Sequence, residues 1–163
     1  MYILSIDPGN EFSAYCLISK KDLRPVRFDK TDNHNLLLVI HKLIQEYDIE
    51  HFAIEMVASY GMAVGRTVFE TCVWIGRFSQ QISEWSFREP TYIYRKDEKL
   101  CLCGSMQAKD SNIRQALVDR FAKHDLRYGK GTKKDPDWFY GFRADIWQAY
   151  AVGITFRDME LRE

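Results

Sequence analysis

The chain has 163 residues, of which 46% are hydrophobic, and this fits one compact domain with its own core but is too short for two. It contains no run of the roughly 18 to 20 apolar residues that a membrane helix needs, and its N-terminus lacks the basic and apolar stretches of a signal peptide. We therefore expect a single domain, residues 1–163, in the cytoplasm and without a membrane partner.

The formal net charge of zero hides a basic segment. Residues 95–134 carry eleven Lys or Arg against five Asp or Glu, a net of +6, whereas residues 1–94 and 135–163 each carry a net of −3. Such a separation is expected when carboxylates gather for chemistry while another surface meets an anionic polymer. An ordinary solvated charged face explains the charge pattern equally well.

The four cysteines do not indicate a zinc site. Cys16 and Cys72 are far apart, and Cys101 and Cys103 have a spacing that common zinc sites do not use. We expect reduced thiols, in line with a reducing compartment.

Strands and one helix follow each other in the first third of the chain. Residues 2–6 and 13–19 are rich in β-branched and large apolar types and are typical of strands, and residues 26–28 predict a third strand that completes a meander. Asp32 or Asn33 can cap a helix whose apolar positions, from Leu36 to Tyr47, recur every three or four residues. The run HFAIE, residues 51–55, then predicts a buried strand.

The rest of the chain predicts three more helices and one more strand. A helix is expected over residues 66–85, where Phe69 and Val73 lie off the apolar stripe, which indicates either a dimer contact or packing beneath a loop. Residues 91–95 predict a strand, residues 110–123 and 144–156 predict helices, and the Gly- and Lys-rich segment 128–141 predicts a loop. This order favours an α/β fold with a five-stranded mixed sheet flanked by helices.

Three acids stand at the ends of predicted elements. Asp7 and Glu55 each follow an isoleucine at the end of a buried strand, so parallel neighbouring strands would place them side by side, and Asp145 begins the last helix. Each alone has a plainer explanation, as a turn former, a strand-end residue or a helix-start acid. Two close carboxylates, however, share a proton or bind a cation. The three acids together predict a site for Mg²⁺ or Mn²⁺, which prefer oxygen ligands.

The blocks SIDPG, HFAIE and ADIWQAYAVGIT resemble, in order and over nearly the whole chain, the three motif blocks of the RuvC family of Holliday junction resolvases. This family lies within the RNase H-like superfamily, and the resemblance is to its bacteriophage members in particular. It implies an RNase H-like fold, a homodimer, and two Mg²⁺ ions, for which Mn²⁺ can substitute. It also implies that Asp7, Glu55 and Asp145 are metal ligands and catalytic residues, and that a phage-encoded protein would act in the cytoplasm of a bacterial host.

One position departs from the family pattern. Members often have a second acid three residues further along the last helix, where this chain has Gln148. A glutamine oxygen can serve as a metal ligand but brings no negative charge, so the second metal would be held more loosely or with help from Asp135 or Asp137. Those two aspartates are otherwise ordinary loop residues.

Basic and aromatic residues are the candidates for holding DNA. Lys99 and Lys109 flank CLCGSMQA, where the family has functional lysines, and they are candidate catalytic residues or plain surface lysines. Tyr60, in the glycine-flanked loop after the second motif block, would stack on a base or separate the strands, unless it packs in the core. Candidate phosphate contacts, which position DNA without reading its sequence, are Arg66, Arg77, Lys130, Lys133 and Lys134.

The sequence thus predicts a metal-dependent, structure-selective endonuclease that cleaves phosphodiester bonds in branched DNA, in DNA recombination and phage DNA processing. Its partners would be four-way junctions, together with forks, flaps and three-way branches. Two alternatives stay open. Gln148 makes a branched-DNA-binding protein with weak or lost cleavage conceivable. The Asp-Pro-Gly turn is also similar to the phosphate-binding loop of actin-like and sugar-kinase-type nucleotide-binding domains, although those proteins are duplicated and longer.

Overall fold

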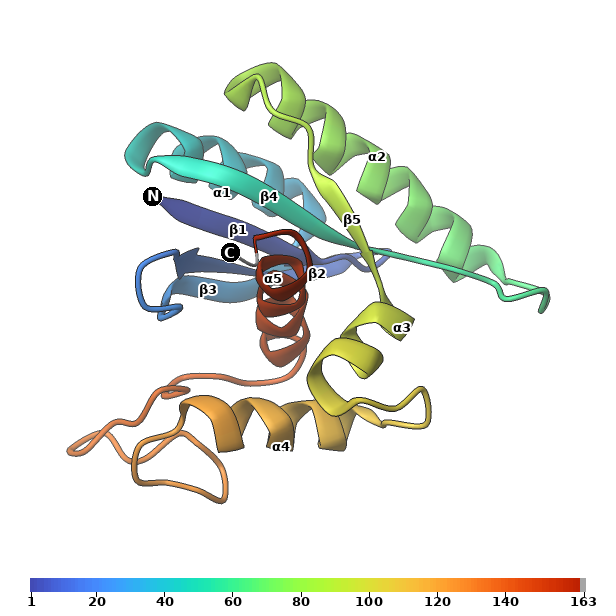
Figure 1. The fold of residues 1–163 in the computed structure, drawn as a ribbon. Coiled ribbons are helices and arrows are strands. Elements are labelled where there is room, and N and C mark those ends of the chain that lie inside the picture. Colours follow the sequence, from blue (N-terminus) through green and yellow to red (C-terminus); the bar gives the residue numbers. More distant parts are fainter. Residues whose placement is uncertain (162–163) are drawn as a thin grey trace.

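A five-stranded sheet runs through the middle of the molecule (Figure 1). In this computed structural model, which describes residues 1–161, the strand order is β3-β2-β1-β4-β5. The outer meander is antiparallel, with β1 against β2 and β2 against β3, while β4 is parallel to both β1 and β5. The strands are β1 Tyr2–Asp7, β2 Phe12–Ser19, β3 Pro25–Asp32, β4 Ile49–Met56 and β5 Thr91–Tyr94. The predicted five-stranded mixed sheet is confirmed.

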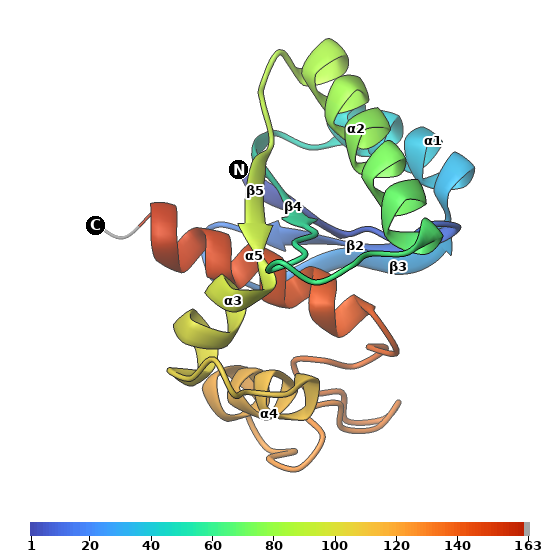
Figure 2. The ribbon, with the colours of Figure 1, turned by 90° about the vertical axis from the view of Figure 1, so that its right-hand side faces the viewer.

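Helices cover both faces of this sheet (Figure 2). The helices α1 (Asn33–Glu46) and α2 (Arg66–Ser86) pack on one face, and α5 (Ile146–Glu160) crosses the other. The helix α4 (Asp110–Phe121) packs on the far side of α5, and it is joined to β5 by the short helix α3 (Arg95–Glu98) and the π-helix η1 (Lys99–Cys103). None of these helices is long and apolar enough to span a membrane.

The alternation of side chains along the strands builds two separate cores. Ile3 and Ala53 belong to the core beneath α5, whereas their neighbours Leu4 and Ile54 belong to the core beneath α1 and α2. Because successive side chains of a strand point to opposite faces, residues an even number of positions further on share a face. Asp7 and Glu55 therefore lie on the face that α5 covers.

The helix α5 lies very close to the sheet. A Cβ atom on Gly153 would lie 2.4 Å from Cδ1 of Ile18 and 2.8 Å from Oγ of Ser5, so this approach requires a glycine. At the centre of the contact, the Ser5 hydroxyl donates to the carbonyl oxygen of Ala149 at 2.7 Å. These contacts fix the start of α5 over the carboxyl ends of β1 and β4.

Several boundaries differ from those that the sequence predicted. The last helix begins at Ile146 rather than at residue 144, because Ala144 has a φ of 46°, in the left-handed region that does not continue a helix, and Asp145 is the N-cap. The third strand is longer than residues 26–28 because it pairs with β2 along Pro25–Asp32. The sequence analysis assigned no structure to residues 96–103, and these form α3 and η1.

Phe69 and Val73 lie on the outer side of α2 and are 61% and 62% exposed. The explanation that they pack beneath a loop is therefore wrong. The four cysteines, all within residues 1–161, form no disulfide.

Candidate active site

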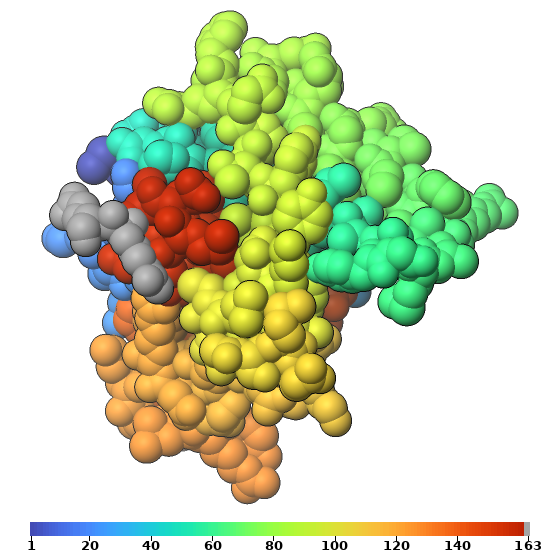
Figure 3. Space-filling view, turned by 45° about the vertical axis from the view of Figure 1, so that its right-hand side comes forward, coloured from blue at the N-terminus to red at the C-terminus, as the bar shows by residue number. Residues whose placement is uncertain are grey.

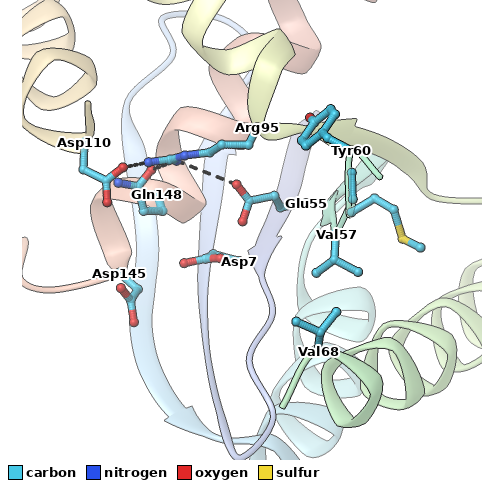
Figure 4. A pocket seen from close by; sticks show the side chains of 11 residues that line it. Asp7, Glu55, Val57, Tyr60, Val68, Arg95, Asp110, Asp145 and Gln148 are labelled. Atoms are coloured by element: carbon cyan, nitrogen blue, oxygen red, sulfur yellow. Dashed lines mark hydrogen bonds and ion pairs between the residues drawn. The ribbon is translucent and has the colours of Figure 1, made fainter. Parts of the chain in front are cut away.

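One pocket of about 400 Å³ lies at the carboxyl ends of the parallel strands, and its lining includes Gln148 and the four carboxylates of Asp7, Glu55, Asp110 and Asp145 (Figure 4). In the register of β1 and β4, Ile6 pairs with Ile54, so the next residues, Asp7 and Glu55, lie side by side. Asp145 and Gln148 reach the pocket from the start of α5. The structure thus brings together the four residues that the sequence analysis selected as metal ligands.

The carboxylates of Asp7 and Glu55, at the ends of β1 and β4, repel each other. Burial is the main reason that the pKa of Asp7 is raised well above its usual value, and the Glu55 and Asp145 carboxylates raise it further, while Arg95 lowers it. The Oε1 atom of Glu55 is buried and has no hydrogen-bond partner. An excess of negative charge at a buried pair is relieved by a proton or by a bound cation.

The third acid is held at the rim of the pocket. Asp145 is about half exposed, and its Oδ2 accepts a hydrogen bond from Nζ of Lys30, on β3, at 2.5 Å. Among residues 1–161, no three His, Cys, Asp or Glu side chains are closed around a point as a metal site. The donor chemistry nevertheless fits a hard divalent cation, because the acids offer oxygen ligands only and one buried oxygen of Glu55 accepts no hydrogen bond. Binding such an ion requires Asp145 to turn away from Lys30.

Arg95, which directly follows β5, crosses the pocket above the acids (Figure 4). Its Nη1 donates to Oε1 of Gln148 and lies 3.7 Å from Oε1 of Glu55 and 3.4 Å from Oε1 of Glu98. Its Nη2 forms an ion pair with Asp110, at the start of α4. A single guanidinium therefore connects the sheet edge, α3, α4 and α5.

Arg95, Glu98 and Asp110 are not among the site residues that the sequence predicts. Arg95 could have been predicted, because it is a charged residue at the end of the predicted strand 91–95. Asp7 and Glu55 were selected for the same reason, since each stands at the end of a predicted strand. Glu98 is fully buried behind the pocket, and burial together with the neighbouring Glu55 carboxylate raises its pKa to about 11, so that it is protonated at neutral pH. Glu98 and Asp110 lay in a segment whose path the sequence pattern did not reveal.

The wall opposite Asp110 and Asp145 is formed by Val57, Val68 and Tyr60 (Figure 4). Tyr60 is 59% exposed, so the explanation that it packs in the core is wrong. It lies in segment 57–65, which extends from the body of the molecule at the right of Figure 3. An exposed aromatic side chain is thus available at the pocket, as a base-stacking role requires.

None of the predicted basic residues lines the pocket. Lys99 lies in η1, and Lys109 is exposed and directly precedes Asp110. On α2, Arg66 pairs with Glu70 at 2.5 Å, and the guanidinium of Arg77 lies 4.1 Å from the ring centre of Trp74. The segment between α4 and α5, at the lower end of Figure 3, carries Lys130, Lys133 and Lys134.

The two loop aspartates lie outside the pocket. The carboxylate of Asp137 accepts hydrogen bonds from the backbone N–H groups of Lys123, His124 and Asp125, and these bonds outweigh the effect of burial and lower its pKa. Asp135 lies 3.4 Å from Nε2 of His124. Asp137 therefore organises the loop that carries the lysines, and neither aspartate is placed to help hold a metal.

No family model matches the chain, and no curated protein sequence matches it. Solved structures do. RuvC from Thermus thermophilus in complex with a Holliday junction substrate superposes with a TM-score of 0.73 at 12% identity, over 97% of this chain and 93% of that chain. A second structure of Thermus thermophilus RuvC gives a TM-score of 0.67 at 14% identity, over 98% of this chain and 97% of that chain. The chain therefore has the RNase H-like α/β fold in the form found in RuvC.

Proposed function

We propose that the protein is a divalent-metal-dependent endonuclease that cleaves phosphodiester bonds in branched DNA, with four-way junctions as its main substrate. The observation that carries this proposal is the convergence of Asp7, Glu55 and Asp145, from three separate elements, on one pocket. The similarity to a RuvC structure that holds a Holliday junction substrate supports it. Such an activity would serve DNA recombination, and phage DNA processing if the gene is carried by a phage.

Asp7, Glu55 and Asp145 would hold Mg²⁺ or Mn²⁺, which supplies a water of lowered pKa and stabilises the negative charge of the departing oxygen. Asp7 must lose its proton for this, and its raised pKa favours that step at neutral to alkaline rather than acidic pH. Arg95 presents a guanidinium to the scissile phosphate, and its planar fork suits two phosphate oxygens. Tyr60, at the mouth of the pocket, is placed to stack on an unpaired base.

DNA would approach across the basic segment. Lys109 stands beside the pocket, and Lys99, Lys130, Lys133 and Lys134 continue the positive charge along the same part of the chain. Contacts of this kind position the phosphate backbone and carry no sequence information, so we infer that shape selects the substrate. Forks, flaps and three-way branches also present phosphate backbones at a branch point, and they are included in the proposal.

The protein would act as a homodimer, because two symmetric cuts in a junction need two sites. Phe69 and Val73 form an exposed apolar pair one turn apart on α2. Surfaces of this type are typical of protein interfaces. We place the dimer contact there.

One observation favours a second candidate, a protein that binds branched DNA without cutting it. Gln148 and Asp145 are already engaged by Arg95 and Lys30. In a non-cleaving protein these contacts would be permanent and the pocket would bind no metal.

One experiment distinguishes the candidate functions. The protein is incubated with a synthetic four-way junction, with a linear duplex of the same sequence and with ATP, each in the presence of Mg²⁺ or Mn²⁺. We expect paired nicks in the junction, in strands of like polarity, and none in the duplex. A gel shift without nicks would support the non-cleaving candidate. Hydrolysis of ATP without junction cleavage would overturn the proposal in favour of a nucleotide-binding domain.

A further inference from the structure

We propose that Arg95 is a catalytic residue that supplies the second positive charge of the active site, so that the pocket takes one divalent ion rather than two. This inference rests on the nuclease function proposed above. It differs from the two-ion arrangement that the resemblance to the RuvC family implies, and it gives a reason for the glutamine at position 148.

The position of the guanidinium carries the inference. A second metal ion would need oxygen ligands from Glu55 and from the residue at position 148, on α5. In this chain Arg95 stands between these two side chains, with its Nη1 bonded to Oε1 of Gln148 and 3.7 Å from Oε1 of Glu55. A divalent ion at the same point would meet a fixed positive charge at contact distance, and like charges at that range repel strongly.

The identity of residue 148 agrees with this arrangement. A carboxylate at position 148 would bind a metal ion with its charge, whereas the neutral amide of Gln148 accepts a hydrogen bond from Arg95 and adds no negative charge beside the guanidinium. A phosphate therefore competes for Arg95 with one carboxylate fewer. The amide at position 148 and the guanidinium of Arg95 thus act together in this chain.

Arg95 can exchange a protein partner for the substrate. Its Nη2 is paired with Asp110, whose side chain is 70% exposed, whereas Nη1 is held by partners in the interior of the pocket. Surface ion pairs are weak, so an incoming phosphate oxygen can replace Asp110 at little cost while Nη1 keeps the guanidinium aligned. No bond to Arg95 is made or broken: it stabilises negative charge on the phosphate as the attacking water bonds to phosphorus and the leaving oxygen departs.

The experiment counts metal ions. Isothermal titration of the full chain with Mn²⁺ gives the number of ions per chain, and electron paramagnetic resonance shows whether two Mn²⁺ ions are magnetically coupled. We expect one uncoupled ion for the wild type and for Arg95→Lys. The double variant Arg95→Gln, Gln148→Asp removes the fixed charge and restores an acid, and we expect it to bind two coupled ions.

Cleavage kinetics give the second readout. At saturating Mg²⁺, Arg95→Gln should lower kcat by about 100-fold with little change in KM for the junction, as expected when a group acts mainly on the transition state. Arg95→Lys should recover part of the loss. The control is Arg88→Gln, which removes an exposed arginine outside the pocket and should leave kcat and metal binding unchanged. Thermal unfolding shows that each variant is folded.

The two proposals fail differently. Two coupled Mn²⁺ ions in the wild type, with normal junction cleavage, would overturn the role of Arg95 and leave the nuclease function intact. An unchanged kcat in folded Arg95→Gln would do the same. A wild type that binds no Mn²⁺ and cuts no junction would overturn both.

Discussion

Asp7 and Glu55 lie side by side because β1 and β4 are parallel neighbours in which Ile6 pairs with Ile54, one residue before the acids. Both side chains face α5, and burial with mutual repulsion raises the pKa of Asp7 well above its usual value. The proximity of the two carboxylates would thus serve to bind a metal ion, but it is electrostatically unfavourable when no metal is bound.

Asp7→Asn should keep junction binding and lower cleavage by about 100-fold or more, because it removes a metal-ligand charge at the reacting centre and leaves the basic surface intact. It should also raise the Tm of the metal-free protein at neutral pH, because a charged carboxylate at this buried position is unfavourable. Gel shifts, cleavage rates and thermal unfolding measure the three effects. Asp22→Asn, at an exposed acid between β2 and β3, is the matched control. Normal cleavage by Asp7→Asn in Mg²⁺ would refute its role.

Glu98→Gln should flatten the pH dependence of stability. The pKa of Glu98 is raised to about 11 in the folded protein, against about 4.3 in an unfolded chain, so its stabilising contribution is complete below pH ~4.3 and is lost as the pH rises toward 11. The loss amounts to about 1.4 kcal/mol per pH unit for a single proton. A glutamine amide has nearly the same shape and does not ionise.

The measurement is the free energy of unfolding, or Tm, between pH 5 and pH 9 in the absence of metal. Wild type and Glu98→Gln should converge near pH 5 and separate in favour of the variant as the pH rises. Glu89→Gln, at an exposed glutamate, should follow the wild type. Parallel curves for wild type and Glu98→Gln would mean that Glu98 is ionised in the folded protein.

The double variant Lys133→Gln, Lys134→Gln should weaken junction binding and reduce its salt dependence. Two lost phosphate contacts lower the slope of log K against log salt by about 1.8, since each contact on duplex DNA contributes about 0.9. The cleavage rate at saturating protein should not change, because neither lysine lines the pocket. Lys42→Gln, on α1 at the other face of the sheet, is the control. An unaltered slope would remove these lysines from the DNA surface.

Phe69→Glu should convert a dimer to a monomer at micromolar concentration. A charge placed in the centre of an apolar contact weakens association by about 2 kcal/mol or more. Sedimentation equilibrium measures the dissociation constant. Phe87→Glu, at a residue that is 92% exposed beyond the end of α2, tests whether any new surface charge has the same effect. If wild type and Phe69→Glu dissociate equally, the contact lies elsewhere.

The local spacing of apolar residues was sufficient to predict much of the fold. Helices that pack on either face of the sheet must bury one side, and this places apolar residues at regular intervals in the sequence. The helix predicted over residues 66–85 is α2 almost to the residue, since its apolar stripe must face the sheet. The boundary errors occurred where partners outside the segment decide the structure. Seven of the eight residues of β3 pair with β2, although none of the eight is fully buried.

The order of residues was enough to predict the strands, the main helices and the three acids, because carboxylates that follow buried isoleucines at strand ends form a local pattern. The side chains that surround these acids depend on how the chain folds as a whole. Arg95 and Asp110 line the pocket, and Glu98 is buried beside Arg95, because α3 and η1 turn the chain beneath the sheet edge. That turn depends on packing against α5 rather than on a local pattern. The partner of Gln148 likewise depends on the fold, because Arg95, which donates to it, lies 53 positions earlier in the chain.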